Sequence, residues 1–339
     1  MSDKKKMGFF QKTKNMTDTN LLLAITMIVF FAMYIGAMIF EGKGFLKAQT
    51  FLNMLNANAA LIIASCGMSI VMITGSIDIS VGGVAALVSM CCAVYLDYHG
   101  GNVVTAIFIS LGIGLLFGLV QGYLVAYLDI QPFIVSLAGM FFARGMTTIV
   151  NTEPFNVQNE AFVKLKETRV IVPGLGSVNK LGKYVNAYVE IGVVVALILV
   201  IVLFCMLRWS KSGRNFYAVG GNQQSALMLG INVKKTKFMA HLLCSLLAGI
   251  GGFVYFMHVG SGSASHATGM EMNAIASSII GGTMLTGGVG NIIGTLFGVL
   301  SLSTIQNIVS SAGLDQAWWT GITIAAMLCL FLVIQSVVM

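Results

Sequence analysis

The residues of this sequence most able to carry a function are the charged and titratable residues that lie in apolar stretches. Those inside, or at the ends of, long apolar runs are Asp78, Arg144, Glu190, His241 and Glu271. A charge in hydrocarbon is costly, so residues in this setting are functional candidates by default. Asp78 just precedes an apolar run, where its carboxylate is expected to cap free backbone N–H groups of a helix. Glu271 is expected to cap or orient a short helix, and Arg144 to face protein or water near the outer mouth of a cavity.

The polar residues form no constellation typical of catalysis. The sequence has no P-loop, no nucleophile elbow and no metal-spaced histidine pair, because His99, His241, His258 and His266 are scattered. We therefore expect a chain that is not an enzyme, holds no metal or cofactor, and cannot itself use ATP. His241 is interpreted as a hydrogen-bonded residue at a helix interface rather than a proton relay. The scarcity of carboxylates in the apolar runs argues against proton-driven secondary transport.

The composition requires lipid as the solvent for most of the surface. Apolar residues make up 57% of the chain and charged residues 9%, whereas soluble domains carry about 25% charged residues. The runs are continuous rather than alternating, which excludes a β-barrel, and backbone groups in hydrocarbon must pair internally. The predicted fold class is an all-α integral membrane protein with about ten transmembrane helices, at 21–40, 57–74, 81–95, 103–128, 133–150, 185–207, 238–259, 274–285, 289–309 and 318–339.

Two of these runs, 81–95 and 274–285, are shorter than the about 17–25 residues of a simple crossing, and each adjoins a glycine cluster. Short, glycine-interrupted segments are typical of broken helices around a translocation site. Glycine for close helix packing, or for short loops, explains the same clusters equally well. The residues assigned to a translocation path or broken helix are Gly75, Ser76, Asp78, Ser80, Gly82, Gly83, Arg144, Glu271, Thr286, Gly287, Gly288 and Gly290.

A weak repeat links the two glycine clusters. Ile-Ala-Ser followed by Thr-Gly occurs at 63–65 and 74–75, and again at 275–277 and 286–287. The pattern is either a trace of duplication or a coincidence.

A polar island at 208–232 separates the sixth apolar run from the seventh. It contains no acidic residue, and Arg208, Lys211 and Arg214 lie within it. Short loops rich in Lys and Arg are typical of the cytoplasmic side, so we predict that the basic tail 1–20 and a loop at 208–236 are cytoplasmic and that 151–184 is an external loop. Five Lys and Arg residues in 151–186 conflict mildly with this orientation. The run 21–40 is longer than a signal-peptide core of about 7–15 residues, and we interpret it as a retained helix.

Within the island, Gly220 and Gly221 are expected to form a turn. Residues 223–230 contain helix formers and end at Gly230, a typical C-cap. Leu227, Met228 and Ile231 give this short helix an apolar side. Such a ridge suggests insertion into a groove on a partner; the alternative is that it folds back on the chain's own bundle.

The segment 224–230, QSALMLG, resembles the coupling motif of ABC importer permeases, Glu-Ala-Ala-x-x-x-Gly. Ala226 and Gly230 match, while Gln224 and Ser225 replace the first two residues. Around it, GSIDISVGG, QPFIVSLAGMFFARG, SGRNFYAVGGN, NAIASSIIGGTMLTGGVGNIIGTLFG and AWWT look like the carbohydrate permeases of the ribose, xylose and galactose type. The resemblance covers 57–321, and LAGMFFARG is most similar to galactofuranose-type permeases. Asn273 stands where the family commonly has Asp, and Gln224 lacks the charge of the usual Glu in the docking helix.

The resemblance implies a single permease domain at 21–339, the membrane subunit of an ABC importer that moves a monosaccharide, a pentose or a hexose such as galactofuranose, into the cytoplasm. Implied partners are a second permease subunit, identical or homologous, a cytoplasmic ATPase that uses the ATP, an external sugar-binding protein and the bilayer of the bacterial inner membrane, with no nucleic acid. Alternatives are an ABC permease for nucleosides or branched-chain amino acids, and a stand-alone secondary sugar transporter. The resemblance assigns ATPase coupling to Gly220, Gly221, Gln223, Gln224, Ser225, Ala226, Leu227, Met228 and Gly230.

Overall fold

The computed structural model describes residues 18–41, 45, 47–178, 184–314 and 316–338. Each of the ten predicted runs corresponds to one helix: α2 (Asp18–Glu41), α3 (Ala48–Ile73), α4 (Val81–Asp97), α5 (Val103–Ala126), α6 (Pro132–Val150), α8 (Ile191–Trp209), α11 (Val233–Val259), α12 (Met270–Ile280), α13 (Ile292–Ser311) and α14 (Ala317–Val338). Eight of them are long and apolar enough to cross a membrane. The other two, α4 with 17 residues and α12 with 11, are the predicted short helices. The predicted fold class is therefore confirmed, although most of the predicted tail lies outside the described residues.

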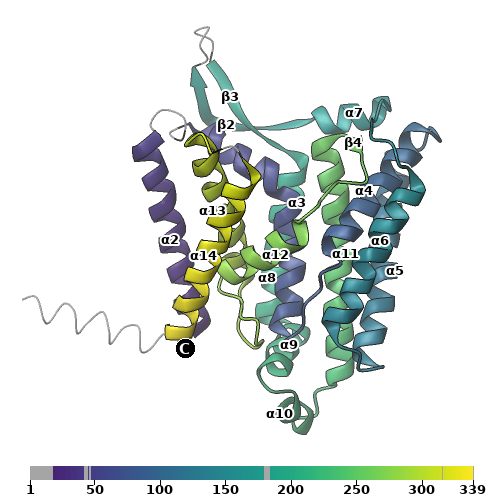
Figure 1. Cartoon of the computed structure of the whole chain (residues 1–339), viewed down its shortest axis with the longest axis vertical. Coiled ribbons are helices and arrows are strands. Elements are labelled where there is room, and N and C mark those ends of the chain that lie inside the picture. Colours follow the sequence, from purple (N-terminus) through teal and green to yellow (C-terminus); the bar gives the residue numbers. More distant parts are fainter. Residues whose placement is uncertain (1–17, 42–44, 46, 179–183, 315, 339) are drawn as a thin grey trace, which may run out of the picture.

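The ten helices pack into one bundle with α3 near its centre (Figure 1). In the most apolar stretch of α3, 89% of the residues are buried, against 11% for α14. Small residues let α11 approach α3 closely. A Cβ on Gly67 would lie 3.1 Å from the Cα of Cys244, and one on Gly251 would lie 3.2 Å from the carbonyl oxygen of Ala60. Close backbone approach at small residues is how membrane helices associate without a hydrophobic driving force.

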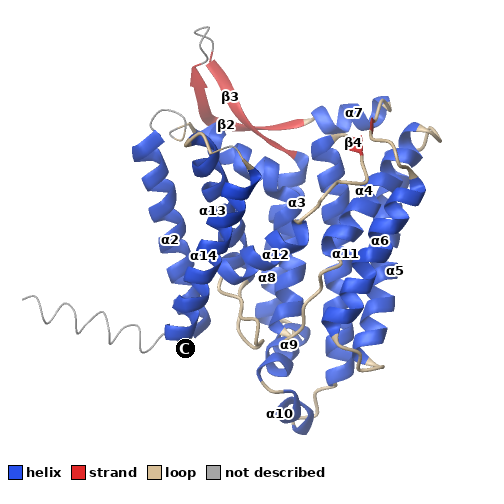
Figure 2. Ribbon diagram, in the orientation of Figure 1, coloured by secondary structure: helices blue, strands red, loops and turns tan. Residues whose placement is uncertain are grey.

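The two ends of the bundle differ in structure (Figure 2). One end carries an antiparallel hairpin of β2 (Arg169–Val178) and β3 (Tyr184–Glu190), the helix α7 (Glu160–Glu167) and a short ladder of β1 (Phe155–Asn156) with β4 (Ser261–Gly262). The other end carries α9 (Lys211–Gly221) and α10 (Gln223–Met228). The described residues of the segment 151–184 thus lie largely in regular elements rather than in a simple loop.

The predicted starts of α8 and α3 differ most from the structure, and the hairpin explains both. Helix α8 begins at Ile191 rather than at 185, because 185–190 pairs with β2 as strand β3. Helix α3 begins at Ala48 rather than at 57. Its first turns are polar, and their side chains bind the hairpin: Gln49 accepts from the N–H of Tyr188 (2.9 Å), and Asn56 accepts from the N–H of Glu190 (2.9 Å). These polar groups are paired at the hairpin end, so the helix extends beyond its apolar run.

Candidate functional site

The predicted docking helix is present as α10 and is defined at both ends. At its start, Asn222 accepts a hydrogen bond from the N–H of Ser225 (2.8 Å), which satisfies one of the free donors of the first turn. Just after its end, Gly230 has a φ of 78°, the left-handed conformation that glycine adopts without strain at a helix C-terminus.

Helix α10 turns one side toward the bundle and its apolar ridge away from it. Ala226 is 2% exposed, whereas Leu227 is 64% and Met228 is 87% exposed. Ile231, the third residue of the predicted ridge, is half-buried, and Leu229 is 79% exposed in its place. The structure therefore disagrees with the alternative in which this ridge folds back on the bundle. Leu227 and Met228 at the end of α10, together with the C-cap residue Leu229, form an apolar surface suited to burial in a groove.

Helix α9 connects α10 to both glycine clusters through backbone contacts. The N–H of Gly288 donates to the carbonyl of Ile73 (2.9 Å) and so joins the two clusters. A Cβ on Gly220 would collide with that carbonyl and would lie 2.6 Å from the nitrogen of Gly288. A Cβ on Gly287 would lie 2.9 Å from both the carbonyl oxygen of Gly220 and the Cα of Gly75. We call the contact of Ile73, Gly75, Gly220, Gly287 and Gly288 the glycine junction.

A side-chain bond from α9 supports the junction. The hydroxyl of Tyr217 donates to the carbonyl of Gly290 (2.8 Å). Burial raises the pKa of Tyr217 to about 12, so the phenol remains a donor at neutral pH. The predicted turn at Gly220 and Gly221 is wrong, because they are the last two residues of α9 and Asn222 is its C-cap. At Gly220 glycine serves close approach rather than a turn.

The weak repeat of the two clusters packs against itself. The hydroxyls of Ser65 and Ser277, which occupy equivalent positions in the two copies, are 2.8 Å apart. The equivalent glycines, Gly75 and Gly287, meet in the glycine junction. Residues that correspond in the two copies of the repeat are thus also neighbours in the structure.

The two short helices, α4 and α12, which we call the half-helices, meet at their N-termini inside the bundle. A Cβ on Gly82, in the first turn of α4, would collide with the carboxylate of Glu271 in the first turn of α12, and would lie 3.1 Å from the carbonyl oxygen of Ala267. From this point α4 runs to the hairpin end, where Asp97 accepts from the N–H of Gln158 (2.7 Å). Helix N-termini carry partial positive charge, so a carboxylate is favoured where the two meet.

Arg144 of α6 holds the segment that precedes α12. Its Nη1 donates to the carbonyl of His266 (2.5 Å) and its Nη2 to the carbonyl of Ala267 (2.8 Å). The same Nη2 lies 4.0 Å from Glu271 Oε2. Arg144 therefore faces protein, and fixes both the segment and the carboxylate at the start of α12.

Asp78 is fully buried, and its carboxylate holds the residue that precedes α4. Its Oδ1 accepts from the N–H (3.0 Å) and the hydroxyl (2.6 Å) of Ser80, and its Oδ2 accepts from the hydroxyl of Ser245 (3.4 Å). The carboxylate thus orients the N-cap residue Ser80, and does not bind the first-turn N–H groups as the sequence suggested.

His241 on α11 is also buried, and neither ring nitrogen has a partner within the described part of the chain. The predicted hydrogen bond of His241 is wrong, because the packed interface brings no donor or acceptor within reach.

The residues assigned to a translocation path fall in two places. The residues at or beside the glycine junction are Gly75, Thr286, Gly287, Gly288 and Gly290. Those around the N-termini of α4 and α12 are Asp78, Ser80, Gly82, Gly83, Arg144 and Glu271. Ser76, which is buried, lies on the segment between them. At Gly83, a Cβ would come within 3.0 Å of the carbonyl oxygen of Met140, so this glycine serves close packing of α4 on α6.

Known proteins with similar sequences identify the family. A family described as "Branched-chain amino acid transport system / permease component" matches residues 50–332. The chain belongs to this family. Because its members are permease components of transport systems, the chain is a multi-pass membrane permease and not an enzyme.

Several named relatives are similar to this permease over most of its length. The inner membrane ABC transporter permease protein YjfF of Escherichia coli (strain K12) is 35% identical over 94% of this chain and 93% of the relative. The fructose import permease protein FruG of Bifidobacterium longum (strain NCC 2705) is 34% identical over 83% and 81%. The ribose import permease protein RbsC of Escherichia coli (strain K12) is 32% identical over 80% and 81%. No solved structure matches the chain.

Sequence reasoning missed several residues of this permease that support the site. Gln121 of α5 donates from Nε2 to the hydroxyl of Ser80 (2.9 Å), and Ser245 and Tyr217 make the bonds given above. Gln121 had a visible signal, since it is an amide in a mostly apolar run. The roles of Gly220 and Ser245 depend on contacts between segments far apart in the chain, which spacing does not reveal.

Proposed function

We propose that this permease is the membrane subunit of an ABC importer that carries a monosaccharide into the cytoplasm, driven by a separate ATPase. The observation that carries the proposal is α10, a short helix with an exposed apolar ridge that is joined through α9 to both glycine clusters. Relatives named for fructose, ribose and xylose support a sugar as cargo. Pentoses and hexoses, galactofuranose among them, are the proposed class. The family description keeps a branched-chain amino acid as the second candidate.

The proposed orientation puts α10 in the cytoplasm and the β2–β3 hairpin outside. Its support is the basic character of the α10 end. Lys211 and Arg214 lie in α9, and the adjoining ends of α8 and α11 carry Arg208, Lys234 and Lys235. Cytoplasmic loops of bacterial membrane proteins carry such an excess of Lys and Arg. The tail 1–20 is proposed to be cytoplasmic as well, and the membrane to be the bacterial inner membrane, as the name of YjfF states for that relative.

The proposed partners follow from this orientation. The ATPase binds the ridge of α10 and moves it when ATP binds. An external sugar-binding protein delivers the cargo to the hairpin end, and a second permease subunit, identical or homologous, completes the path. The chain itself uses no ATP.

The glycine junction is the proposed route from the ATPase to the path. Gly220 touches backbone atoms of both clusters, so no flexible side chain at that contact can absorb a displacement of α9. The first cluster precedes α4 and the second follows α12, and discontinuous helices of this kind form the sites around which transporters alternate access. A movement of α10 is therefore expected to shift both half-helices together.

Uptake by reconstituted vesicles tests the proposed function. The permease is reconstituted with its ATPase and binding protein, and uptake of labelled D-ribose, D-xylose, D-fructose, D-galactose, L-leucine and uridine is compared. The expected result is uptake of a monosaccharide that requires ATP and both partners. Uptake of leucine or uridine but of no sugar would contradict a monosaccharide as the cargo. Uptake by the permease without its partners, driven by a proton or sodium gradient, would contradict the assignment as an ABC importer subunit.

Docking of the ATPase is tested on the ridge of α10. The double change Leu227→Asp and Met228→Asp places two charges on a surface proposed to be desolvated, and a central interface residue contributes about 2 kcal/mol, roughly thirtyfold in affinity. The ATPase should then no longer copurify with a permease that still inserts. Leu175→Asp is the matched control, because Leu175 is also an exposed apolar residue but lies on the hairpin at the opposite end. Unchanged copurification in the double variant would rule out α10 as the docking site.

A further inference from the structure

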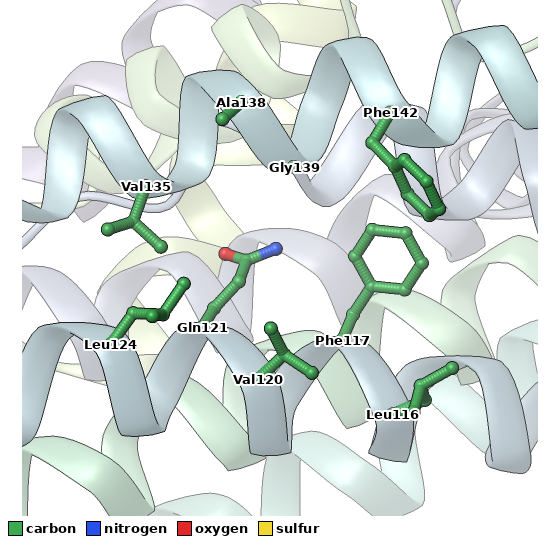
Figure 3. Close-up of a pocket in the computed structure, with 9 residues that line it drawn as sticks. All are labelled: Leu116, Phe117, Val120, Gln121, Leu124, Val135, Ala138, Gly139 and Phe142. Atoms are coloured by element: carbon green, nitrogen blue, oxygen red, sulfur yellow. The ribbon is translucent and has the colours of Figure 1, made fainter.

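A cavity of about 430 Å³ lies between α5 and α6 (Figure 3). It is open along the outer side of the bundle, where Leu116, Val120 and Phe142 are exposed, and its inner end reaches Ser80 at the start of α4 through Gln121. Its wall is almost entirely apolar: Leu116, Phe117, Val120, Leu124, Val135, Ala138, Gly139 and Phe142 line it together with Gln121. Small-molecule sites are typically about 300–1,000 Å³, with apolar walls and a few polar groups that orient the ligand. Gln121 is the polar group of this wall.

The carbonyl oxygen of Gln121 has no hydrogen-bond partner within the described chain, although the residue is only 3% exposed. Figure 3 shows its amide directed into the space between the two helices, with the oxygen on the side of Val135. An unpaired buried acceptor costs about 1–3 kcal/mol, so an occupant that donates a hydrogen bond is favoured at this place.

The orientation of the Gln121 amide is fixed by the buried carboxylate behind it. The hydroxyl of Ser80 donates its proton to Asp78 Oδ1 (2.6 Å), which leaves the hydroxyl oxygen free only to accept. It accepts from Gln121 Nε2 (2.9 Å). A flipped amide would face the Ser80 lone pairs with its oxygen, so the free end of Gln121 is the carbonyl, an acceptor.

Gly139 makes room for this arrangement. A Cβ at position 139 would lie 2.6 Å from Gln121 Nε2 and 3.4 Å from the Cβ of Ser80. Any larger residue on this face of α6 would push the amide away from the cavity. The site is thus built from three elements: α5, α6 and the segment before α4, which carries both Ser80 and Asp78.

We infer that this cavity is where the transported sugar contacts the permease, with a sugar hydroxyl donating to Gln121 Oε1 and the apolar sugar face against Phe117 and Phe142. The inference rests on the proposed function. A hydrocarbon chain would leave the carbonyl unpaired, whereas a polyhydroxylated ligand supplies the missing donor. One hydrogen bond in an apolar wall also suits transport, because a path must bind its cargo weakly enough to release it.

Thiol labelling in the reconstituted importer tests the inference. Ala138→Cys places a thiol on the cavity wall, and its reaction with the water-soluble reagent 2-sulfonatoethyl methanethiosulfonate is followed in the unchanged cysteine background. The transported member of the uptake panel, added in excess, should slow this reaction. Adding Gln121→Met should raise the sugar concentration for half protection about fivefold, the effect expected for one hydrogen bond. Lys164→Cys, on exposed α7 away from the cavity, is measured in the importer without the binding protein, which is proposed to cover this end, and should react equally with and without sugar.

Several results would overturn the inference. The thiol of Ala138→Cys does not react, or it reacts at a rate that the transported sugar leaves unchanged. Gln121→Met leaves the protection by sugar intact. Ala138→Cys crosslinks to a second copy of the permease instead of being labelled. Ala138→Trp provides an independent check, since it fills the cavity and keeps Gln121 itself, and should reduce sugar uptake more than about tenfold. If uptake of every monosaccharide fails in the unmodified importer, the proposed function fails instead. If uptake proceeds but the cavity is not protected, only this inference fails.

Discussion

Two contact regions of the bundle, the glycine junction and the surroundings of the N-termini of α4 and α12, have opposite character. At the glycine junction, the clusters around Gly75 and Gly287 meet each other and α9 through backbone atoms. Deeper in the bundle, the segments beside α4 and α12 are held by side chains: Asp78 binds Ser80, and Arg144 binds the segment before Glu271. One region requires that side chains be absent, and the other requires particular polar groups.

This difference predicts different responses to mutation. Adding a single methyl group at the junction forces backbone apart, because protein interiors lack space for it. Around the half-helices, the damaging changes are those that remove a donor or acceptor and leave its partner buried and unpaired. The junction is therefore expected to govern coupling, and the polar contacts the stability of the closed bundle.

The largest effect is expected for Gly220→Ala. The new Cβ would overlap the carbonyl of Ile73 and approach the nitrogen of Gly288, and overpacking of this kind costs about 1–3 kcal/mol. Sugar-stimulated ATP hydrolysis by the reconstituted importer should fall by more than about tenfold, since 1.4 kcal/mol corresponds to a factor of ten.

Gly221→Ala is the matched control for this change. A Cβ on Gly221 meets nothing within 4 Å, so the same substitution one residue later should change hydrolysis by less than about twofold, as for other exposed positions. If both variants lose hydrolysis equally, the loss comes from replacing a glycine of α9 by alanine at either position, and not from the contact of Gly220 with the two clusters.

A smaller effect, on stability, is expected for Arg144→Met. The substitution leaves the carbonyls of His266 and Ala267 without their donors and Glu271 without its cation. Because Arg144 is partly exposed, we expect a loss of about 2 kcal/mol, seen as a lower unfolding temperature in detergent.

Adding Glu271→Gln to Arg144→Met separates the ion pair from the carbonyl bonds. The double variant should recover part of the loss, because the unpaired carboxylate is removed. If the double variant is as unstable as Arg144→Met, the carboxylate contributes nothing and the two carbonyl bonds account for the whole effect.

The smallest effect is expected for Tyr217→Phe. It removes one hydrogen bond, to Gly290, and leaves the packing of the ring unchanged, at a cost of about 1 kcal/mol. Sugar-stimulated hydrolysis should fall about threefold to fivefold. An effect as large as that of Gly220→Ala would show that the side-chain bond, and not the backbone contact, carries the coupling.

The parts of this structure that depend on local pattern were predictable. Continuous apolar runs require helices, so the helix order could be predicted, and the two short helices were recognised by length beside glycine. Helix α10 was recognisable from Ala226 and Gly230 and their spacing.

The parts that depend on distant segments were not predictable in this way. Nothing near Gly220 shows that its neighbours are Ile73 and Gly288, and a glycine pair resembles a turn until those neighbours are known. The start of α3 was missed for the same reason, since Gln49 is tolerated there only because the hairpin binds it. The free carbonyl of Gln121 became recognisable only once Ser80 and Asp78 were placed behind it.

The central claim is that a movement of α10 reaches the glycine clusters through the junction. Thr286 is exposed beside the junction, so a cysteine at this position reports on it. In the assembled importer, Thr286→Cys should react with a water-soluble maleimide at different rates in the nucleotide-free state and with a non-hydrolysable ATP analogue. Adding Gly220→Ala should abolish that difference. Equal rates in the two nucleotide states, in an importer that still transports sugar, would contradict the account.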